Sequence, residues 1–375
     1  MYKIPFHKYR LSIEEEKAVL RVLRSGWLTS GKEVASFESE FSSYIGDNVA
    51  SVAVSSCTSA LFIALRGLGL PQGSKILLPS LTYVSDVLSI IHLGLVPVLL
   101  DISLDDYCVD INEIERNISN EVRALLVVHY AGNPCDMNPI VELCKKNNIY
   151  LVEDCAHALE TRYFGKNVGV YGDASVYSFY PNKNITTAEG GMIVSQDIDL
   201  IANCRKLRNH GIDVDSATQS ASFTLRNYDI IEPGYKMNMN DLQAALGRVQ
   251  LKSIQSLYEQ RLKLFGLYRE FLDSDKVNII FNNDPNVLCS HHLMPIEVDE
   301  NKREKLIAKL LESGVQPSLH FKPIHKFSFA QKFAWAKSKL PNTDVAYKRQ
   351  LSLPLYPTME PEEVEYVCKI VNGSL

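Results

Sequence analysis

The sequence predicts an α/β protein of three layers, in which helices cover both faces of a mostly parallel sheet. Short apolar runs recur through the first half of the chain, and the first five alternate with stretches of helical character. Strands that are apolar along nearly their whole length are typical of parallel sheets buried on both faces. The seven runs are VAVSS (52–56), KILLPS (75–80), PVLLDI (97–102), ALLVVHY (124–130), YLVED (150–154), ASVYSFY (174–180) and GMIVS (191–195).

Two helices are expected before the first strand. Ser12 and Glu15 form a capping box, and apolar residues then recur at helical spacing until Ser25 and Gly26 end the helix. Residues 33–45 are expected to form the second helix.

The chain is expected to divide into a large domain, residues 1–250, and a smaller α+β domain, residues 251–375. A long helix is predicted over residues 240–261 or beyond, with Asn240 or Asp241 as its N-cap. The loop at about 211–234 is long for a compact domain, and loops of that length are usually functional or mobile. The smaller domain is expected to contain strands at 277–281, 291–298 and 315–320, and helices at 302–313 and 360–371.

Composition excludes several classes of function. The 375 residues carry a net charge of −5, with no polybasic run that would indicate nucleic-acid binding. No apolar stretch reaches the length of a membrane span, and the N-terminal stretch lacks the apolar region of a signal peptide. The eight cysteines are scattered without a C-x-x-C pair, so we expect no metal site and a cytoplasmic location.

Polar side chains follow most of the predicted strands. In open α/β sheets, ligands bind beyond the carboxyl ends of the strands. Any one of these residues could be an ordinary strand-terminal polar residue, but their convergence on one edge favours a ligand site. They are Ser55, Ser56, Thr58, Ser80, Thr82, Tyr83, His129, Tyr130, Asp154, His157, Ser178 and Lys183.

Asp154 and Lys183 are the strongest candidates for chemistry. A buried carboxylate needs a cation, which could be Lys183, an arginine or a protonated pyridine nitrogen. A buried salt bridge is the simplest interpretation. The alternative is a lysine that forms a Schiff base with a carbonyl cofactor, and an aspartate that keeps the ring nitrogen of this cofactor protonated. His157 could then contact the cofactor ring or merely cap the following helix.

A phosphate site is expected where Thr58 and Ser59 open a helix directly after a strand. Free N–H groups at a helix N-terminus, together with hydroxyls, bind phosphate, although ordinary N-capping would give the same pattern. Ser178 could add a hydroxyl, and Tyr83 could cover a cofactor ring with its aromatic face.

Motifs along nearly the whole chain resemble those of sugar-nucleotide aminotransferases of the DegT/StrS type, which are fold-type I pyridoxal-phosphate enzymes. The motifs are SGWLTSGKEVASFESEF (25–41), SSCTSAL (55–61), PSLTYVS (79–85), VHYAGNPCDM (128–137), EDCAHAL (153–159), SFYPNKNITTAEGGMIV (178–194), LRNHG (207–211), GYKMNMNDLQAALGRVQL (234–251) and LSLPLYPTM (351–359).

The resemblance implies a role for each candidate. Lys183 would carry pyridoxal 5'-phosphate and shuttle the substrate proton, and Asp154 would bind the pyridine nitrogen. His157 would contact the ring or its phenolic oxygen, and Tyr83 stands where the family has a stacking aromatic residue. The phosphate would be bound by Thr58, Ser59 and Ser178.

Asn238 matches an asparagine that reaches the cofactor phosphate of the neighbouring subunit, so the resemblance implies a homodimer with shared active sites. Many members read G-Y-N-x-R-M at 234–239, whereas this chain reads GYKMNM. The G-Y-K-x-N form occurs in a subset that includes enzymes aminating 4-keto pentoses or 6-deoxyhexoses.

The implied reaction is a transfer of an amino group from glutamate to a nucleotide-linked keto-sugar, at C4 of a 4-keto-(6-deoxy)hexose, in polysaccharide or lipopolysaccharide biosynthesis. Amination of a UDP-4-keto-pentose or of a 3-keto sugar nucleotide is the alternative. His320 and His325 are expected on the substrate side, although His320 could equally be a core histidine. A dehydratase of the same fold carries histidine in place of Lys183, and a cofactor-binding regulatory protein without turnover is a remote alternative.

Overall fold

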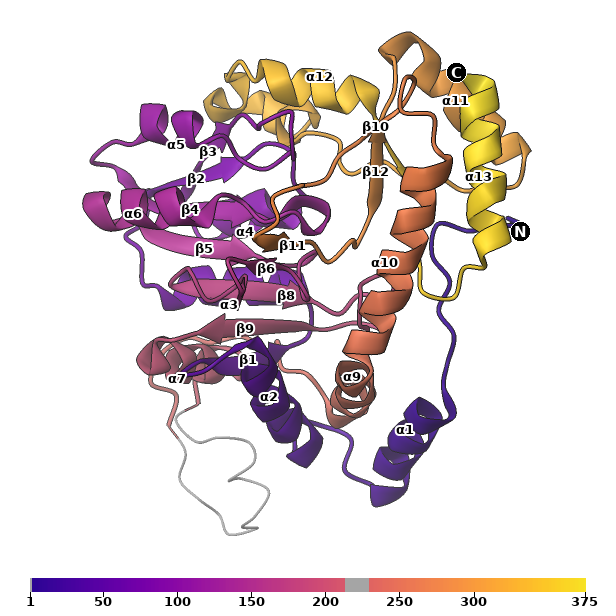
Figure 1. Cartoon of the computed structure of the whole chain (residues 1–375). Helices are drawn as coiled ribbons and strands as arrows, with labels where there is room; N and C mark the ends of the chain where they lie inside the picture. The colour runs from indigo at the N-terminus through magenta and orange to yellow at the C-terminus, as the bar shows by residue number, and fades with distance from the viewer. Residues whose placement is uncertain (1, 213–228) are drawn as a thin grey trace.

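The centre of the larger part of the molecule is a seven-stranded sheet (Figure 1). The computed structural model describes residues 2–212 and 229–375, so most of the predicted long loop lies outside the described residues. The sheet order is β1-β9-β8-β5-β4-β2-β3, and β9 alone runs antiparallel to its two neighbours. All seven predicted strands are therefore confirmed. They are β1 (Ala50–Val54), β2 (Lys75–Pro79), β3 (Val96–Leu100), β4 (Val122–Val128), β5 (Tyr150–Asp154), β8 (Ala174–Ser178) and β9 (Gly191–Ser195).

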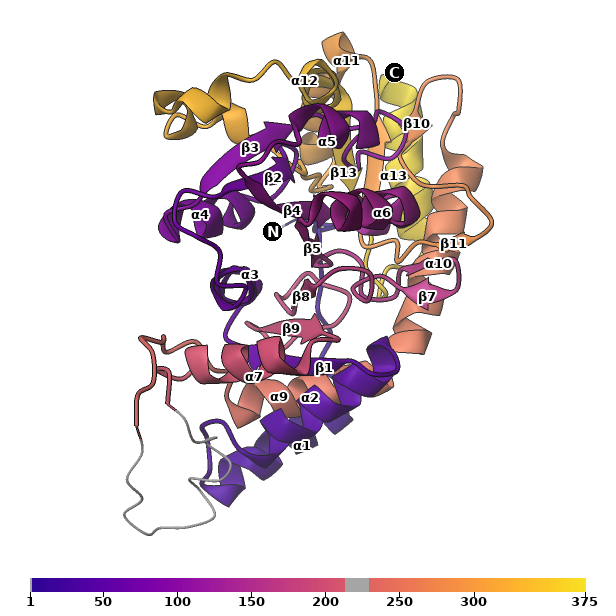
Figure 2. The same ribbon diagram turned by 90° about the vertical axis from the view of Figure 1, so that its left-hand side faces the viewer.

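Helices pack on both faces of this sheet, which confirms the three layers (Figure 2). Consecutive side chains of a strand point to opposite faces, so Leu77 joins one apolar cluster while Ile76 and Leu78 join the other. The first face is covered by α2 (Lys32–Ile45), α5 (Ile111–Asn117), α6 (Met137–Asn147) and α9 (Asp241–Lys252). The second face is covered by α3 (Cys57–Gly67), α4 (Ser85–His92) and α7 (Ile198–Leu207).

The expected capping signals are present. α1 (Ile13–Ser25) begins with the Ser12–Glu15 capping box and ends at Gly26, whose φ of 73° lies in the left-handed region that favours glycine. Asn240 caps α9 through a capping box with Gln243. The long helix predicted from residue 240 is in fact two helices, because α9 ends and α10 (Ile254–Phe271) begins at Ser253.

The C-terminal part contains a second, three-stranded sheet made of β10 (Asn278–Ile279), β12 (Met294–Glu297) and β13 (Gln350–Leu353). It packs with α10, α11 (Glu300–Glu312) and α13 (Pro361–Ser374) around an apolar cluster that also includes Ile4. The division at residue 250 stays a prediction, and α12 (Pro341–Arg349) is hydrogen-bonded to the large sheet through Thr343 and Asp101.

One predicted strand is wrong. Residues 315–320 form only two isolated bridges, from Val315 to Ile4 and from Ser318 to Ser352, because the segment has different partners on its two sides. A third small sheet, β11-β6-β7, joins Val287–Leu288 to the hairpin of Arg162–Tyr163 and Lys166–Asn167.

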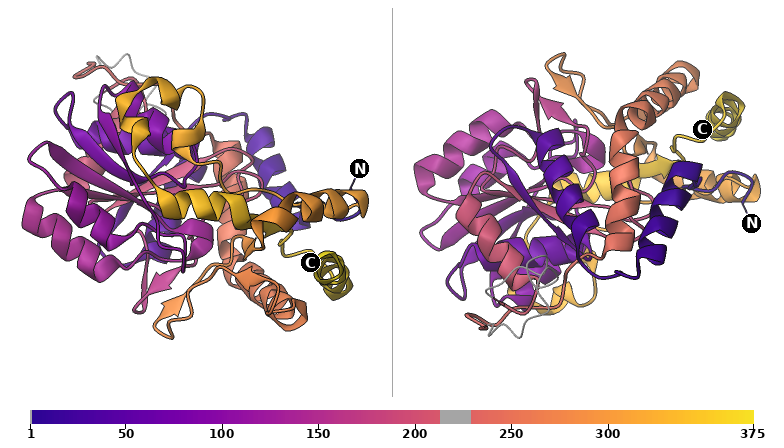
Figure 3. Two further views of the ribbon diagram at one scale, coloured as in Figure 1. Left: turned by 90° about the horizontal axis from the view of Figure 1, so that it is seen from above. Right: turned by 90° about the horizontal axis from the view of Figure 1, so that it is seen from below.

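Both ends of the chain lie on the side of the molecule formed by α10, α11 and α13 (Figures 1 and 3). Within residues 2–212 and 229–375, no helix combines the length and the apolar character that crossing a membrane requires. All eight cysteines are free thiols.

Candidate active site

A cavity of about 380 Å³ lies at the carboxyl ends of the parallel strands. Residues that follow β1, β2, β5 and β8 line it, as the convergence of polar residues on one sheet edge predicts. The structure thus brings together most of the predicted site residues, namely Thr58, Tyr83, Asp154, His157, Ser178, Lys183 and His320.

Asp154 enters the cavity from the last position of β5. Its Oδ1 accepts a hydrogen bond of 2.8 Å from the backbone N–H of Ala156, and the side chain is buried. Burial raises the pKa of Asp154, while the Ala156 N–H and the Lys183 ammonium oppose this shift. The carboxylate is therefore held in a place where a further cation would stabilise it.

Lys183 lies in the connection between β8 and β9, where its backbone N–H donates to the Tyr180 carbonyl at 3.0 Å. Enclosure by the cavity walls lowers the pKa of Lys183 to about 8, against the opposing effect of Asp154. In the described residues, Lys183 and Asp154 form no ion pair, so they are not the simple salt bridge that their sequence pattern allows. At this pKa about a tenth of the amine is neutral and nucleophilic at pH 7, far more than for an ordinary lysine.

The N-terminus of α3 forms another wall. Ser56 is the N-cap, and its Oγ accepts from the Ser59 N–H at 3.1 Å. Thr58 faces the cavity, but Ser59 does not line it, because its hydroxyl is bonded to those of Ser55 and Ser56 at 3.0 Å each. A Cβ at Gly191 would lie 2.5 Å from the Ser56 carbonyl oxygen, so glycine is required for this close approach of β9 to the helix start.

Rings from both parts of the chain form the remaining wall. The His157 ring stacks on Phe321 with centroids 5.7 Å apart and lies 4.5 Å from the His292 ring. His157 Nδ1 accepts from the Ala131 N–H at 3.3 Å, so the ring proton is assigned to Nε2. Burial lowers the pKa of His157 well below its usual range, which keeps the ring neutral. Tyr83 is 57% exposed, with its ring 5.9 Å from Phe321.

His292 and Phe321 line the cavity although the sequence interpretation did not select them as site residues. His292 Nδ1 lies 2.9 Å from Asn184 Oδ1, while Asn184 Nδ2 donates to Glu160 and to the Ser290 carbonyl. His292 Nδ1 is therefore the donor, and its Nε2 is left as an acceptor. The available signals were weak: His292 lies in the segment predicted as a strand, 291–298, and Phe321 directly follows His320.

The two predicted substrate-side histidines differ in position. His320 lines the cavity, its Nδ1 lies 2.9 Å from Ser352 Oγ, and burial lowers its pKa to about 3. His325 does not line the cavity. Its Nδ1 is 2.8 Å from Ser80 Oγ and its Nε2 is 3.0 Å from Asp344 Oδ1, so it attaches its segment to the end of β2.

Asn238 also lies outside the cavity of its own chain. Its Nδ2 donates to Ser30 Oγ at 2.6 Å and to the Met239 carbonyl at 3.3 Å. The predicted contact with the cofactor of a second subunit stays a prediction.

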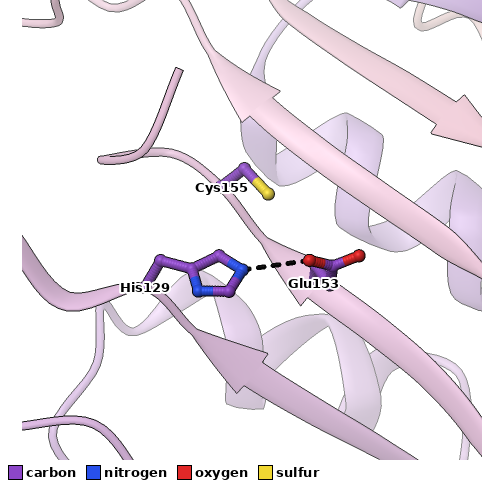
Figure 4. A group of neighbouring side chains, drawn as sticks. All are labelled: His129, Glu153 and Cys155. Carbon is purple, nitrogen blue, oxygen red and sulfur yellow. Dashed lines mark hydrogen bonds and ion pairs between the residues drawn. The ribbon is translucent and has the colours of Figure 1, made fainter. Parts of the chain in front are cut away.

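A group of potential metal ligands, His129, Glu153 and Cys155, lies beneath the strand ends (Figure 4). The Glu153 oxygens accept from the backbone N–H groups of residues 169, 171 and 172, and from His129 Nε2 at 3.1 Å. His129 Nδ1 accepts from the Cys135 N–H at 3.1 Å, so Nε2 carries the proton. Because these atoms are engaged by protein groups, the cluster acts as a structural clamp between β4 and β5.

Comparisons with known proteins agree with this geometry. Residues 10–372 match the model of the DegT/DnrJ/EryC1/StrS aminotransferase family. The spore coat polysaccharide biosynthesis protein SpsC of Bacillus subtilis is 36% identical, with 98% of this chain and 96% of SpsC covered.

Two solved structures are similar over nearly their whole length. The putative sugar aminotransferase Spr1654 of Streptococcus pneumoniae, in its PMP form, has a TM-score of 0.93 and 28% identity, with 99% of each chain covered. PseC of Helicobacter pylori, an aminotransferase involved in the biosynthesis of pseudaminic acid, has a TM-score of 0.91 and 27% identity, with 98% of each chain covered. Spr1654 also has a structure in its PLP form.

Proposed function

Since this chain belongs to the DegT/DnrJ/EryC1/StrS aminotransferase family, we propose that it transfers an amino group from glutamate to a nucleotide-linked keto-sugar. We place the new amine at C4 of a 4-keto-(6-deoxy)hexose. One observation carries the proposal: Lys183, Asp154 and the N-terminus of α3 line a single cavity. The fold is that of fold-type I aminotransferases, and the cofactor of the family is pyridoxal 5'-phosphate.

The residues of the cavity fit this cofactor. Among the described residues, the buried carboxylate of Asp154 has no ion-pair partner, which suits a pyridinium nitrogen, and Lys183 is an amine suited to a carbonyl. The start of α3 has the N–H groups and the Thr58 hydroxyl that suit a phosphate. Only glycine at position 191 allows β9 to approach this helix start. When bound, pyridoxal 5'-phosphate supplies an electron sink for negative charge at the substrate carbon.

Each side chain then has a distinct task. Lys183 would hold the carbonyl group of the cofactor through Nζ, and would move the proton at the substrate carbon as general base and general acid. Asp154 holds the ring nitrogen in its protonated form, and His157 orients the ring through Nε2–H. Ser178 and Thr58 bind the phosphate, and Tyr83 and Phe321 exclude water from the ring faces.

The choice of substrate rests on the relatives and on one motif. SpsC functions in polysaccharide biosynthesis and PseC in the biosynthesis of a sugar acid, which favours a sugar acceptor here. The GYKMNM motif at 234–239 favours a 4-keto-hexose, with a UDP-4-keto-pentose or a 3-keto sugar nucleotide as the alternative. We place His320 on the substrate side and infer a homodimer in which Asn238 reaches the partner's cofactor phosphate.

Purified protein with pyridoxal phosphate and glutamate should be assayed against a panel of nucleotide-linked 4-keto and 3-keto sugars. We expect stoichiometric 2-oxoglutarate and amino-sugar with one 4-keto-hexose, and none with K183A. If the protein binds the cofactor but forms no 2-oxoglutarate, even when glutamate alone is supplied in an amount equal to that of the protein, the regulatory alternative would be favoured. A K183A protein that keeps full turnover would overturn the proposal.

A further inference from the structure

Asp86 is a second buried acid beside the cavity. It lies in the first turn of α4 and is 0% exposed. Thr82 Oγ1 donates a hydrogen bond to its Oδ2, but no group in residues 2–212 or 229–375 donates to its Oδ1. An ionised carboxylate with an unpartnered buried oxygen is unfavourable, so the environment favours the protonated acid.

The neighbour of Asp86 is Asp154. Thr82, which donates to Asp86, and the adjacent Ser85 line the cavity together with Asp154, and the negative charge of Asp154 acts on Asp86. The other titratable groups that face Asp86 are the Lys183 amine and the Cys57 thiol. Two neighbouring buried carboxylates cannot both ionise easily, so the pair holds one proton.

The proton belongs on Asp86. Burial, followed by the negative charge of Asp154, raises the pKa of Asp86 well above its usual range. Asp154 in turn has the Ala156 N–H and the Lys183 ammonium to stabilise its charge. A proton on Asp86 directed at Asp154 also gives the unpartnered carboxyl group a hydrogen-bond partner.

We propose that Asp86 is a positioning residue for the cofactor: its carboxyl O–H donates to the Asp154 carboxylate and so sets how firmly Asp154 holds the proton of the ring nitrogen. The inference rests on the proposed function in taking Asp154 as the partner of that nitrogen. A hydrogen bond donated to Asp154 withdraws charge from it and makes it a weaker partner for a pyridinium. The ring nitrogen therefore loses its proton at a lower pH than it would beside Asp154 alone.

Two variants of similar size separate this role from a packing role. In D86N the amide keeps both contacts, since its oxygen accepts from Thr82 and its N–H₂ donates to Asp154. In D86L the donor is lost while the volume is nearly kept. The readout is the ¹⁵N chemical shift of ring-labelled pyridoxal phosphate in the holoprotein, followed as a function of pH.

We expect the ring nitrogen of wild type and D86N to titrate at a similar pH, and that of D86L about one pH unit higher, the size expected for loss of a hydrogen bond to a charged group. An unchanged or lowered midpoint in D86L would overturn the inference.

Infrared difference spectra of the cofactor-free protein give an independent test. Wild type minus D86N should show the carbonyl band of a protonated carboxylic acid at pH 7, and a band of ionised carboxylate alone would contradict the assignment. Neither readout needs turnover. A protein that titrates as expected without transaminating refutes only the proposed function, whereas an active protein whose D86L variant titrates like wild type refutes only this inference.

Discussion

Glu153 and Asp154 are consecutive acids at the end of β5, and they occupy opposite environments. Glu153 points to the α2 and α6 side of the sheet, where both oxygens accept hydrogen bonds from backbone N–H groups, and one also from His129. Asp154 points to the α3 side and accepts from one backbone N–H, that of Ala156. The first acid has every site filled by the protein, whereas the second retains capacity for a ligand.

The difference shows that the hydrogen bonds of a buried carboxylate indicate whether it has a structural or a ligand-binding role. A carboxylate whose lone pairs are all occupied by its own fold stabilises that fold and has nothing left to bind. A carboxylate that is buried but incompletely hydrogen-bonded lowers the stability of the fold. Binding of a cation restores that stability. The following substitutions test this contrast, in order of decreasing expected effect.

Removing the cavity amine should have the largest effect. K183A should lower the rate of amino transfer by about 10⁴-fold, because the general base and the covalent attachment point are lost together. The measurement is 2-oxoglutarate formation under saturating glutamate. Urea unfolding of the cofactor-free variant serves as the control, and a large loss of stability there would show that Lys183 also supports the fold.

Removing the charge of the clamp should affect stability instead. E153Q should lower the free energy of unfolding by about 3 kcal/mol, because the amide N–H₂ cannot accept the N–H groups that the carboxylate oxygen accepted. The urea midpoint of the cofactor-free protein reports this loss. A midpoint equal to that of wild type would show that the hydrogen bonds accepted by Glu153 do not stabilise the fold.

The same change one residue later should spare stability and reduce activity. D154N keeps Oδ1 as acceptor for the Ala156 N–H. The free energy of unfolding should therefore stay within about 0.5 kcal/mol of the wild-type value. Turnover should fall about 10²-fold, because an amide cannot keep a ring nitrogen protonated. If D154N unfolded as readily as E153Q, the contrast between the two acids would fail.

The last expected effect is a pH dependence of the stability. The pKa of Lys183 is about 8 in the folded protein and near 10.5 when unfolded, so folding is penalised at pH 7. The cofactor-free wild type should gain stability as the pH rises from 8 to 10.5. K183M should be more stable than wild type by about 3 kcal/mol at pH 7, and this difference should shrink over the same interval. A difference that grows with pH would have the wrong sign for a lysine of lowered pKa.

The strands of the large sheet could be predicted from sequence because each is a nearly continuous apolar run. Their order could not, since the antiparallel placement of β9 between β1 and β8 depends on pairing across more than a third of the chain. The strand expected at 315–320 failed because its pairing is divided between Ile4 and Ser352. Local pattern shows that a segment is extended, but not whether a ladder forms.

The site was predictable where a side chain follows a strand directly, as Asp154 does. Ser59 was expected to face the phosphate, but the helix begins at Cys57 and its rotation turns the Ser59 hydroxyl toward Ser55 and Ser56. Asp86 and His292 could not be predicted, because tertiary packing alone brings Asp86 beside Asp154 and His292 to the cavity. Nothing in their local sequence separates them from ordinary helix and loop residues.

The pairing of β1 with β9 also has a consequence for biosynthesis. Val54 and Gly191 are partners in that ladder, and this pairing holds the start of α3 against the loop that carries Lys183. A ribosome must therefore extend the chain past Gly191 before the start of α3 and the lysine can meet, and contacts of such sequence separation form slowly. Cofactor capture is then a late event that marks a chain already folded, and it cannot assist the folding of a nascent N-terminal fragment.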